Sequence, residues 1–469
     1  MRVYVVCIGT SLLALIIPAT LQLANKQYFK EFSFQLYSQC MDIEYSVTGK
    51  FSQGERHTFD YVYDFALKSQ DQGDALISTL FSSLRTYFSD NEELKDPGLL
   101  FVNHLQKVYG LVCNFMKHSN KGELYEDECT SLALDLLNYL DSSDQVREEM
   151  QAGYIQYLVD FHATLHNWVE AAMTQQSQIN MLRWSDEICI GTKNYPREPH
   201  RSRKEKLIRS AMQYFIKGHE YERAISMIKQ LQDYHRYQSF NFPAVAALCN
   251  EESVLWNKID ESWRAYPNYF RVQFFGSGFE ELGLRNKLFV YRGAAVESVR
   301  DFTGRLKAKY QQAHIIPKME VPTPELESKH EQIISIVLLT LTPLEDRRSL
   351  LEELRDSQSV AVPELQDRSH IPRELYHTLS TEVRKQVENN HLFRVLECNR
   401  GVQKSTEKRP ANEFKTLWVE KTYLFTEEAF PTNRRRIPVI WTKVKHITPL
   451  ENAVATVRQK TLKNLPKTP

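Results

Sequence analysis

The order of apolar and polar residues predicts helices in the first half of the chain. Over residues 20–260 the apolar positions recur every three or four residues, which is the period of an amphipathic helix. A second pair of helices is predicted over 207–231, with a turn at Gly218. The clearest run places six large side chains on one face of a single helix: Met150, Tyr154, Leu158, Phe161, Leu165 and Trp168.

Two stretches of this helical part resemble each other at an offset of 53 residues. His166-Asn-Trp168 is followed by Ala171, and His219-Glu-Tyr221 is followed by Ala224. An aromatic residue with a small residue three positions later is typical of stacked helical hairpins, whose partner helices approach at the small residue. Because the offset exceeds the roughly 34 residues of a tetratricopeptide unit, we predict an irregular helical-repeat array (TPR/ARM-like), an architecture commonly used for binding or dimerisation.

The period changes from 3.6 to 2 near residue 266. Phe270, Val272 and Phe274 alternate with Arg271 and Gln273, as in a β-strand. Further β-like runs occupy 288–292, 332–341, 392–396, 415–425 and 437–446. Most of these runs lack a helix between them, so we expect an antiparallel sheet. The predicted fold class is therefore α+β: the helical array is followed by a sheet lobe and the start of a further helix.

Two segments are predicted to interrupt the sheet, and a new helix follows it. Residues 343–359 are highly charged and predict a solvated insertion, whereas 372–390 carries apolar residues every fourth position and predicts a helix packed on the sheet. After the last strand, Thr448, Pro449 and Glu451 form the pattern of a helix N-terminus with a capping box.

Charge and cysteine content narrow the function classes. Lys+Arg and Asp+Glu both number 59, so the net charge favours neither nucleic acid nor an acidic substrate. The charge is uneven, however: residues 71–160 hold 16 acidic against 6 basic side chains, and residues 401–469 hold 14 basic against 6 acidic. This polarity could steer a partner, or simply mark two solvated faces. Seven widely spaced cysteines without a CxxC pair indicate reduced thiols in a cytosolic protein.

The N-terminus leaves two interpretations open. Residues 3–25 carry no charge, and 3–19 are mostly apolar. This pattern suits either a signal peptide or signal anchor, or a core helix buried at the edge of a larger helical array.

Candidate chemistry in the sequence is sparse. His162 and His166 have the spacing of zinc ligands but lack the glutamate after the first histidine, so a helix contact is favoured over a metal site. Gly276-Ser-Gly278 predicts a turn, because it does not complete a phosphate loop. The Arg434-Arg-Arg436 run beside Lys443 and Lys445 could meet nucleic acid or acidic lipid, but a solvated turn is favoured. We therefore predict a binding protein without metal, cofactor or bond-making residues.

Six motifs, in the same order, resemble the exchange domain of the DOCK family, known as DOCKER. They cover roughly residues 125–460. The motifs are Leu182-Arg-Trp-Ser-Asp-Glu-Ile-Cys189, Tyr214-Phe-Ile-Lys-Gly218 with Ala224-Ile225, Tyr266-Pro-Asn-Tyr-Phe-Arg-Val-Gln-Phe-Phe-Gly276, Arg285-Asn-Lys-Leu-Phe-Val-Tyr-Arg-Gly293, Asn412-Glu-Phe-Lys-Thr-Leu-Trp-Val-Glu-Lys-Thr422 and Thr448-Pro-Leu-Glu-Asn-Ala-Val454.

The resemblance implies a guanine-nucleotide exchange factor (a guanine-nucleotide releasing factor) for Rac-like small GTPases in signalling to the cytoskeleton. It implies four parts: 1–124 as the end of an upstream helical array, 125–262 as a helical dimerisation lobe, 266–446 as a GTPase-binding sheet lobe, and 447–469 as the start of a third lobe. The valine that the family uses to expel the nucleotide would lie beyond this sequence, so we expect impaired exchange from the chain by itself. The alternative is a non-catalytic scaffold that dimerises and binds a GTPase or an adaptor.

The resemblance also implies partners and contact residues. The partners would be a Rho-family GTPase of Rac type, a second copy of the chain, and an ELMO-type adaptor for the full-length protein. The location would be the cytoplasm, with recruitment to membranes. For Phe414 and Trp418 a place in the sheet core is the competing interpretation, and for Glu451 it is a capping role. The expected GTPase contacts are Asn412, Glu413, Phe414, Trp418, Glu420, Lys421, Pro449, Leu450, Glu451 and Asn452.

Overall fold

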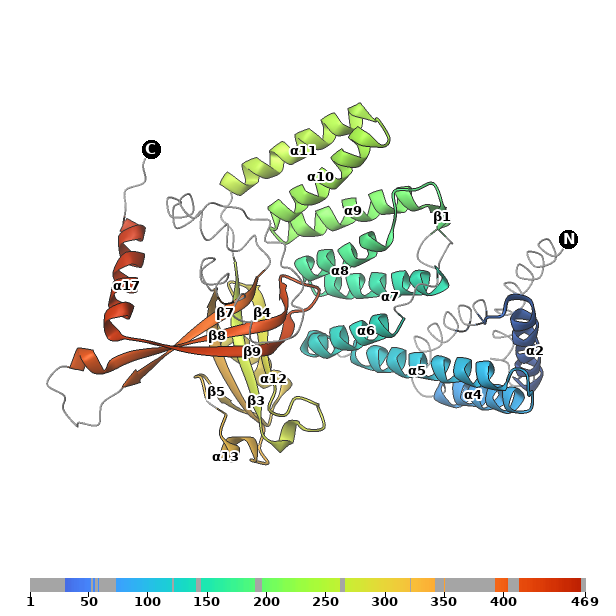
Figure 1. Ribbon diagram of the computed structural model, residues 1–469, viewed down its shortest axis with the longest axis horizontal. Helices are drawn as coiled ribbons and strands as arrows, with labels where there is room; N and C mark the ends of the chain where they lie inside the picture. Colours follow the sequence, from blue (N-terminus) through green and yellow to red (C-terminus); the bar gives the residue numbers. More distant parts are fainter. Residues whose placement is uncertain are drawn as a thin grey trace. The chain divides into compact units, whose positions relative to one another are not determined.

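A computed structural model gives the fold of the chain (Figure 1). The structure describes residues 30–51, 54, 58, 73–119, 122–140, 145–189, 196–261, 266–320, 322–341, 350, 393–403 and 413–464. The chain divides into two compact units, Met1–Asn167 with Thr174–Ile208, and Trp168–Met173 with Arg209–Pro469. The division into four lobes that the resemblance implies stays a prediction.

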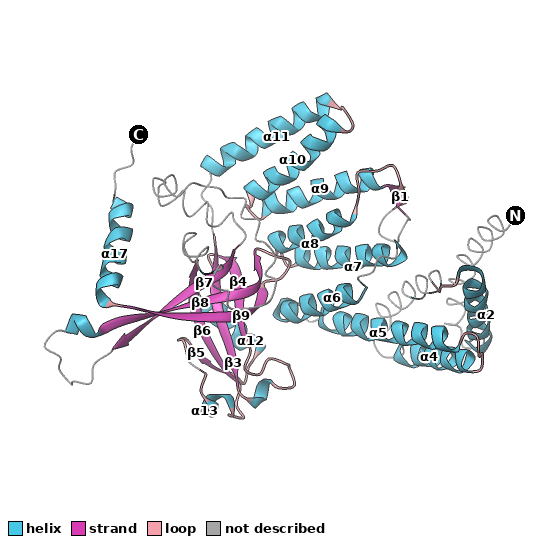
Figure 2. Cartoon of the chain, in the orientation of Figure 1, coloured by secondary structure: helices cyan, strands magenta, loops and turns pink. Residues whose placement is uncertain are grey.

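The first half of the described chain is helical, and a sheet follows it (Figure 2), so the predicted α+β class is confirmed. The amphipathic stripes of the helices α2 to α7 bury a common core that includes Tyr37, Leu84, Val108 and Leu136. The helices are α2 (Lys30–Thr48), α4 (Gly73–Ser89), α5 (Lys95–Ser119), α6 (Glu126–Leu140), α7 (Gln145–Thr164), α8 (Trp168–Met181), α9 (His200–Lys217), α10 (Tyr221–Tyr237), α11 (Phe242–Glu261), α12 (Val299–Lys309), α13 (Pro324–Glu327) and α17 (Pro449–Asn464).

The two similar stretches that begin at His166 and His219, 53 residues apart, each form the same kind of helix ending. His166 and His219 both have a φ of 59°, in the left-handed region. The residue after each histidine donates its N–H to the carbonyl five residues back, at 2.9 Å in both cases, and each histidine donates to the carbonyl three back, at 3.1 Å. This pair of bonds is the Schellman motif, in which glycine usually occupies the left-handed position.

The repeated ending corrects the long helix predicted over 150–168. α7 ends at Thr164, so Leu165 lies in the turn and Trp168 begins α8. The apolar spacing continues through His166, although the backbone of His166 leaves the helical conformation. The period of the apolar residues does not reveal such a break. The pair predicted around Gly218 is confirmed as α9 and α10.

The sheet closes on itself. Its hydrogen-bonded order is β3-β4-β9-β8-β7-β6, and β6 pairs again with β3. All these pairings are antiparallel, as predicted, whereas the short β5 pairs with β6 in parallel. The strands are β3 (Pro267–Phe275), β4 (Leu288–Ala295), β5 (His314–Ile316), β6 (Ile333–Leu341), β7 (Phe393–Gln403), β8 (Leu417–Phe430) and β9 (Arg436–Ile447).

The two faces of the sheet bury separate cores. On the outer face α12, which the sequence pattern did not predict, covers Phe270, and the rings of Phe270 and Phe302 stack 4.0 Å apart. Inside the ring each strand contributes apolar side chains, among them Tyr269, Leu339 and Leu424. Arg271 and Gln273, the polar half of the β3 alternation, are buried as well. Both sides of β3 are covered, so the alternation along this strand does not separate buried from solvent-exposed side chains.

Several predictions concern residues that the structure does not describe. The predicted helix at 372–390 and the apolar stretch 3–25 are among these residues. Of the predicted insertion 343–359 only Leu350 is described, and it is buried against Val395, Tyr423 and Phe425. No helix in the described ranges is long and apolar enough to cross a bilayer. The six cysteines within those ranges are all free thiols.

Candidate partner-binding surface

The register of β8 and β9 brings two distant sequence motifs together. Val419 pairs with Ile447, so the short helix η4 (Glu413–Thr416) before β8 and the helix α17 after β9 meet at the same end of the strand pair. α17 contacts both η4 and β8. The expected contacts from the 412–422 motif and the 448–454 motif therefore belong to one surface, although Asn412 lies outside the described residues and only the backbone of Glu413 is described.

Five apolar side chains are exposed where these elements meet. Their exposed fractions lie between 43% for Val454 and 67% for Leu450. Three of them follow the helical spacing i, i+4, i+7 along α17 and so form one stripe. We call the set the apolar surface: Phe414, Leu417, Leu450, Val454 and Val457. An exposed apolar cluster of this kind is typical of a protein-binding site.

The capping box fixes the direction in which α17 leaves the sheet. The Thr448 hydroxyl accepts a hydrogen bond from the Glu451 N–H at 3.2 Å, and the Glu451 carboxylate accepts from the Thr448 N–H at 2.8 Å. The hydrogen bonds that the Glu451 carboxylate accepts from the N–H and the hydroxyl of Thr448 hold the pKa of Glu451 below its ordinary value. Pro449 is buried behind the cap, while Asn452 is exposed and bonds through its N–H to the Thr448 carbonyl. The capping role of Glu451 is thus present, and a role in binding stays a prediction.

Two other expected contacts, Glu420 and Lys421, form ion pairs across β7 and β8. Arg400 lies 2.9 Å from Glu420, and Lys421 lies 2.9 Å from Glu397. Because neighbouring residues of a strand point to opposite faces, the two pairs stiffen both faces of the ribbon. Trp418 is half-buried and Phe414 is exposed, so Phe414 is not part of the sheet core.

One face of the ribbon is covered by the segment 317–320. The Ser335 hydroxyl donates to the Lys318 carbonyl at 2.6 Å, which anchors the segment. Met319 then places its sulfur 3.7 Å from that of Cys398 and 4.0 Å from the Thr422 hydroxyl. The opposite face carries Lys421, Tyr423 and Phe425, and Leu350 packs there against Tyr423 and Phe425.

The arginine run before β9 has structural partners, which corrects the solvated turn expected there. Arg435 is buried, donates from Nε to the Arg292 carbonyl at 3.1 Å, and accepts from the Arg292 N–H at 2.7 Å. Arg434 pairs with Glu427 at 3.2 Å and with Glu428. Arg436 pairs with Tyr291 in the sheet.

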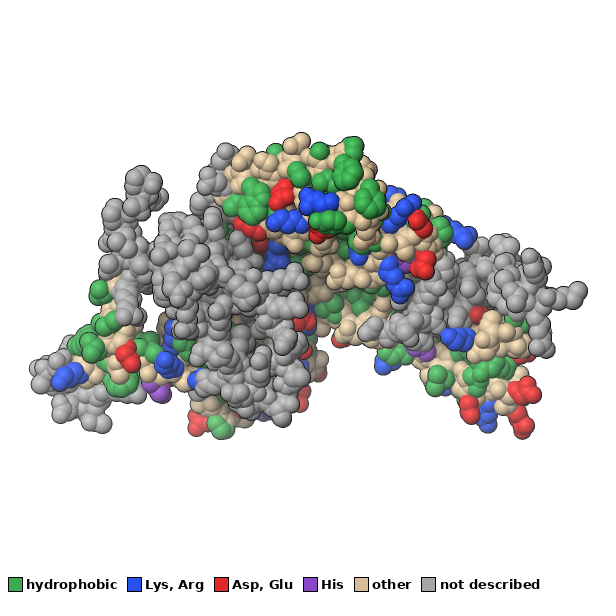
Figure 3. All heavy atoms as spheres, turned by 45° about the horizontal axis from the view of Figure 1, so that its top comes forward, with side chains coloured by type: hydrophobic (Ala, Val, Ile, Leu, Met, Phe, Trp, Pro, Cys, Tyr) green, Lys and Arg blue, Asp and Glu red, His purple; other side chains and the backbone are tan. Residues whose placement is uncertain are grey.

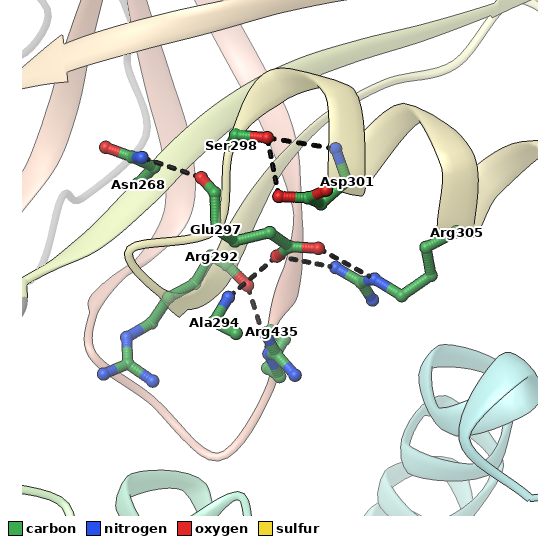
Figure 4. Close-up of polar contacts among 8 residues, drawn as sticks. All are labelled: Asn268, Arg292, Ala294, Glu297, Ser298, Asp301, Arg305 and Arg435. Carbon is green, nitrogen blue, oxygen red and sulfur yellow. Dashed lines mark hydrogen bonds and ion pairs between the residues drawn. The ribbon is translucent and has the colours of Figure 1, made fainter.

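The turn between β4 and α12 holds Arg292 in place (Figure 4). Glu297 accepts hydrogen bonds from the Ala294 N–H at 2.8 Å and from two nitrogens of Arg305 at 3.2 Å, and its carbonyl accepts from Asn268 at 2.8 Å. Val296 has a φ of 60° in this turn, a strained value for a β-branched residue. Gly293 is required beside it, since an added Cβ would lie 2.7 Å from the Phe270 ring.

The side chain of Arg292 leaves this turn and joins the sheet to the start of α8. Its guanidinium lies 2.6 Å from the Glu170 carboxylate, and both side chains are nearly buried. Burial by itself would lower the pKa of Arg292, but Glu170, Tyr269 and Glu220 together raise it. Burial raises the pKa of Tyr269 to about 12, so that phenol stays neutral.

Sequence reasoning missed part of this arrangement. Val454 and Val457 continue the stripe of Leu450, and their spacing was readable, yet a helical stripe in a sequence usually indicates core. The pair of Glu170 and Arg292 had no local signal, because the two residues are 122 positions apart. His162 is buried and lies 3.8 Å from Glu126, as a contact between helices, and within the described ranges no group of His, Cys, Asp or Glu could hold a metal ion.

Comparison of the sequence with known proteins finds several relatives of the chain. The chain is 27% identical to dedicator of cytokinesis protein 3 of Homo sapiens, over 91% of this chain and 20% of that protein. It is 26% identical to human dedicator of cytokinesis protein 4, over the same shares of each chain. It is 22% identical to DOCK-like protein 1 of Saccharomyces cerevisiae, over 82% of this chain and 18% of that protein.

The chain spans about one fifth of the length of these curated relatives. No protein-family model matches it. The resemblance seen in the six motifs and the similarity over 91% of the chain agree: the chain is similar to proteins of the DOCK family.

Proposed function

We propose that the chain is the GTPase-gripping part of a guanine-nucleotide exchange factor for Rho-family small GTPases, of Rac type, in cytoskeletal signalling. The observation that carries the proposal is the apolar surface, formed where the two motifs of the resemblance meet at η4 and α17. The apolar surface includes Phe414 and Leu417 of the 412–422 motif, which resembles a motif of the family's GTPase-binding sheet lobe. A folded protein is therefore favoured as the ligand. With this function the protein would act in the cytoplasm and be recruited to membranes.

Exchange requires no bond-making residue in the exchange factor. GDP is held by a P-loop and Mg²⁺ that the GTPase supplies. A partner promotes release by binding the nucleotide-free state better than the GDP-bound state, and a full shift of population needs a preference of about 10⁴-fold. The apolar surface supplies affinity for the mobile switch loops, and the paired strands β7–β9 supply a rigid support for it.

We expect the chain to bind nucleotide-free Rac-type GTPase at least about 100-fold more tightly than the GDP-bound form. Calorimetry or biolayer interferometry with both forms measures this ratio, and release of a fluorescent GDP analogue gives a second readout. Ras-type GTPase in the same two states is the control for the class of partner. Equal affinity for the two forms of the Rac-type GTPase would contradict the proposal and favour the scaffold function, in which the chain binds without ejecting nucleotide.

We also propose that the hairpin of α10 and α11 forms a homodimer contact. Hydrophobic side chains gather on this hairpin (Figure 3), and Tyr237, Phe240, Phe242 and Trp256 are each about half exposed or more. Phe240 takes a φ of 52°, which presents its ring at the turn between the helices. Exposed aromatic residues are the common anchors of protein interfaces. An ELMO-type adaptor would bind elsewhere in the full-length protein.

The double substitution Phe242→Glu and Trp256→Glu should convert a dimer to a monomer. Buried carboxylates without partners oppose association strongly, while the same groups on an exposed helix leave folding nearly unchanged. Sedimentation velocity at several micromolar concentrations measures the change. Leu282→Glu, at an exposed loop residue between β3 and β4, is the matched control. A monomeric wild-type chain at these concentrations would rule out this contact.

A further inference from the structure

One side of α11 carries a regular stripe of exposed side chains. The helix packs against α10 and buries Leu248 and Leu255. Phe242, Cys249 and Trp256 are exposed and stand seven residues apart, so they lie on one side of the helix over a length of about 21 Å. We call these three residues the α11 stripe. A spacing of seven residues is the one by which two helices pack along each other.

The chain around Phe242 and Cys249 carries no charge. Between Arg236 and Glu251 the sequence holds no aspartate, glutamate, lysine or arginine, and this stretch spans the hairpin turn and the first half of α11. Hydrophobic side chains gather on the same hairpin (Figure 3). Depletion of charge around exposed aromatic residues is typical of the central part of a protein–protein interface.

Trp256 is held in one orientation within the free chain. Its indole N–H donates to the Glu252 carboxylate at 3.1 Å, and Gln232 of α10 donates to the other carboxylate oxygen at 2.9 Å. The ammonium group of Lys229 lies 3.8 Å from the same carboxylate and 5.8 Å from the centre of an indole ring of Trp256. An exposed ring that is already fixed loses little side-chain entropy on binding, so Trp256 is a preorganised anchor.

We infer that α11 pairs with α11 of a second copy of the chain in antiparallel orientation, and that the two helices cross at Cys249. The inference rests on the proposed function, in which the hairpin of α10 and α11 forms a homodimer contact. Because Cys249 lies seven residues from each aromatic residue, a two-fold axis at Cys249 sets Phe242 of each copy opposite Trp256 of the other. The small residue permits a close approach at the crossing, and an aromatic pair fills each end.

The charges beside the α11 stripe fit a second copy of the same surface. Gln232 contacts both Cys249 and Glu252, at 3.6 and 2.9 Å, so it is level with the turn of α11 between them. Arg236 follows one turn later on α10, nearer to Phe242, and interacts electrostatically with Cys249. In an antiparallel pair Arg236 is then level with Glu252 of the second copy. In a parallel pair Arg236 would meet its own counterpart, so charge favours the antiparallel orientation.

Disulfide cross-linking of the full chain tests the crossing point. With copper phenanthroline as oxidant, two Cys249 thiols lose their protons and pass two electrons to copper(II) as the S–S bond forms, which requires α-carbons within about 7 Å. Among the described cysteines Cys249 is the exposed one. We expect a covalent dimer from the wild type and none from Cys249→Ser, although this variant should still sediment as a dimer.

Two variants in the Cys249→Ser background test the direction of the helices. Ala246 and Ser253 are exposed and lie about one turn to either side of Cys249. In the antiparallel pair position 246 of one copy is nearly level with 253 of the other, whereas identical positions are about 9–12 Å apart along the helix. A mixture of the Ala246→Cys and Ser253→Cys variants should therefore form a covalent dimer after subunit exchange, and neither variant should do so by itself.

The outcomes separate this inference from the proposed homodimer. A wild type that sediments as a dimer but does not cross-link through Cys249 overturns the antiparallel pairing and leaves the homodimer in place. Cross-links from each variant by itself, without one between the two, do the same. A wild type that is monomeric at several micromolar overturns both. Binding of that monomer to phosphatidylserine vesicles, lost in Phe242→Glu with Trp256→Glu, would assign the α11 stripe to a membrane surface instead.

Discussion

Replacing Arg292 by methionine is expected to lower the free energy of unfolding by about 3–5 kcal/mol. The substitution leaves the Glu170 carboxylate, now 2.6 Å from the guanidinium, buried with its main counter-charge removed. Removing one partner of a buried ion pair costs more than the pair contributes, because the remaining charge keeps its desolvation penalty. Urea unfolding followed by circular dichroism measures the loss.

The double variant Glu170→Met with Arg292→Met separates charge from packing. With both charges gone, most of the lost stability should return, since apolar replacements of a buried pair are often neutral. The coupling energy of the double-mutant cycle should then exceed about 1 kcal/mol. A single Arg292→Met variant as stable as wild type would contradict this account. So would a double variant whose loss in free energy of unfolding exceeds the sum of the losses in the two single variants. Arg285→Met, which removes an exposed ion pair with Glu280, is the control.

The fold was predictable where a local signal coincides with the structural element. The capping box at Thr448 and Glu451 gave the start of α17, and the aromatic and small residues after His166 and His219 marked the same helix ending twice. The break after α7 was not predictable from periodicity. A histidine in the left-handed conformation is uncommon, and apolar spacing continued through it.

The site was only partly predictable, for a physical reason. The motifs identified Phe414 and Leu450, but nothing in the sequence says that β8 and β9 pair so that Val419 meets Ile447. Strand register depends on the whole closed sheet. For the same reason Arg435 reads as part of a basic run, although the fold buries it against the Arg292 carbonyl. Side-chain exposure is a tertiary property, so the stripe on α17 could not be separated from core beforehand.

The substitution Leu450→Asp is expected to weaken binding of nucleotide-free Rac-type GTPase by about 30-fold or more, as for a central interface residue. Leu450 is 67% exposed, so its loss removes little from the folded core. It lies in the first turn of α17, where an acidic side chain interacts favourably with the helix dipole. The helix should therefore persist while an unpaired carboxylate enters the contact.

Titration calorimetry with the nucleotide-free GTPase measures the loss, and the thermal midpoint of the variant checks its fold. Leu282→Asp, at an exposed apolar residue between β3 and β4, is the matched control and should leave the affinity unchanged. Val457→Asp should reproduce the effect of Leu450→Asp, since Val457 lies on the same stripe seven residues further along α17. Unchanged affinity in both α17 variants would place the GTPase contact elsewhere on the sheet, because a dominant contact does not tolerate a buried charge without a partner.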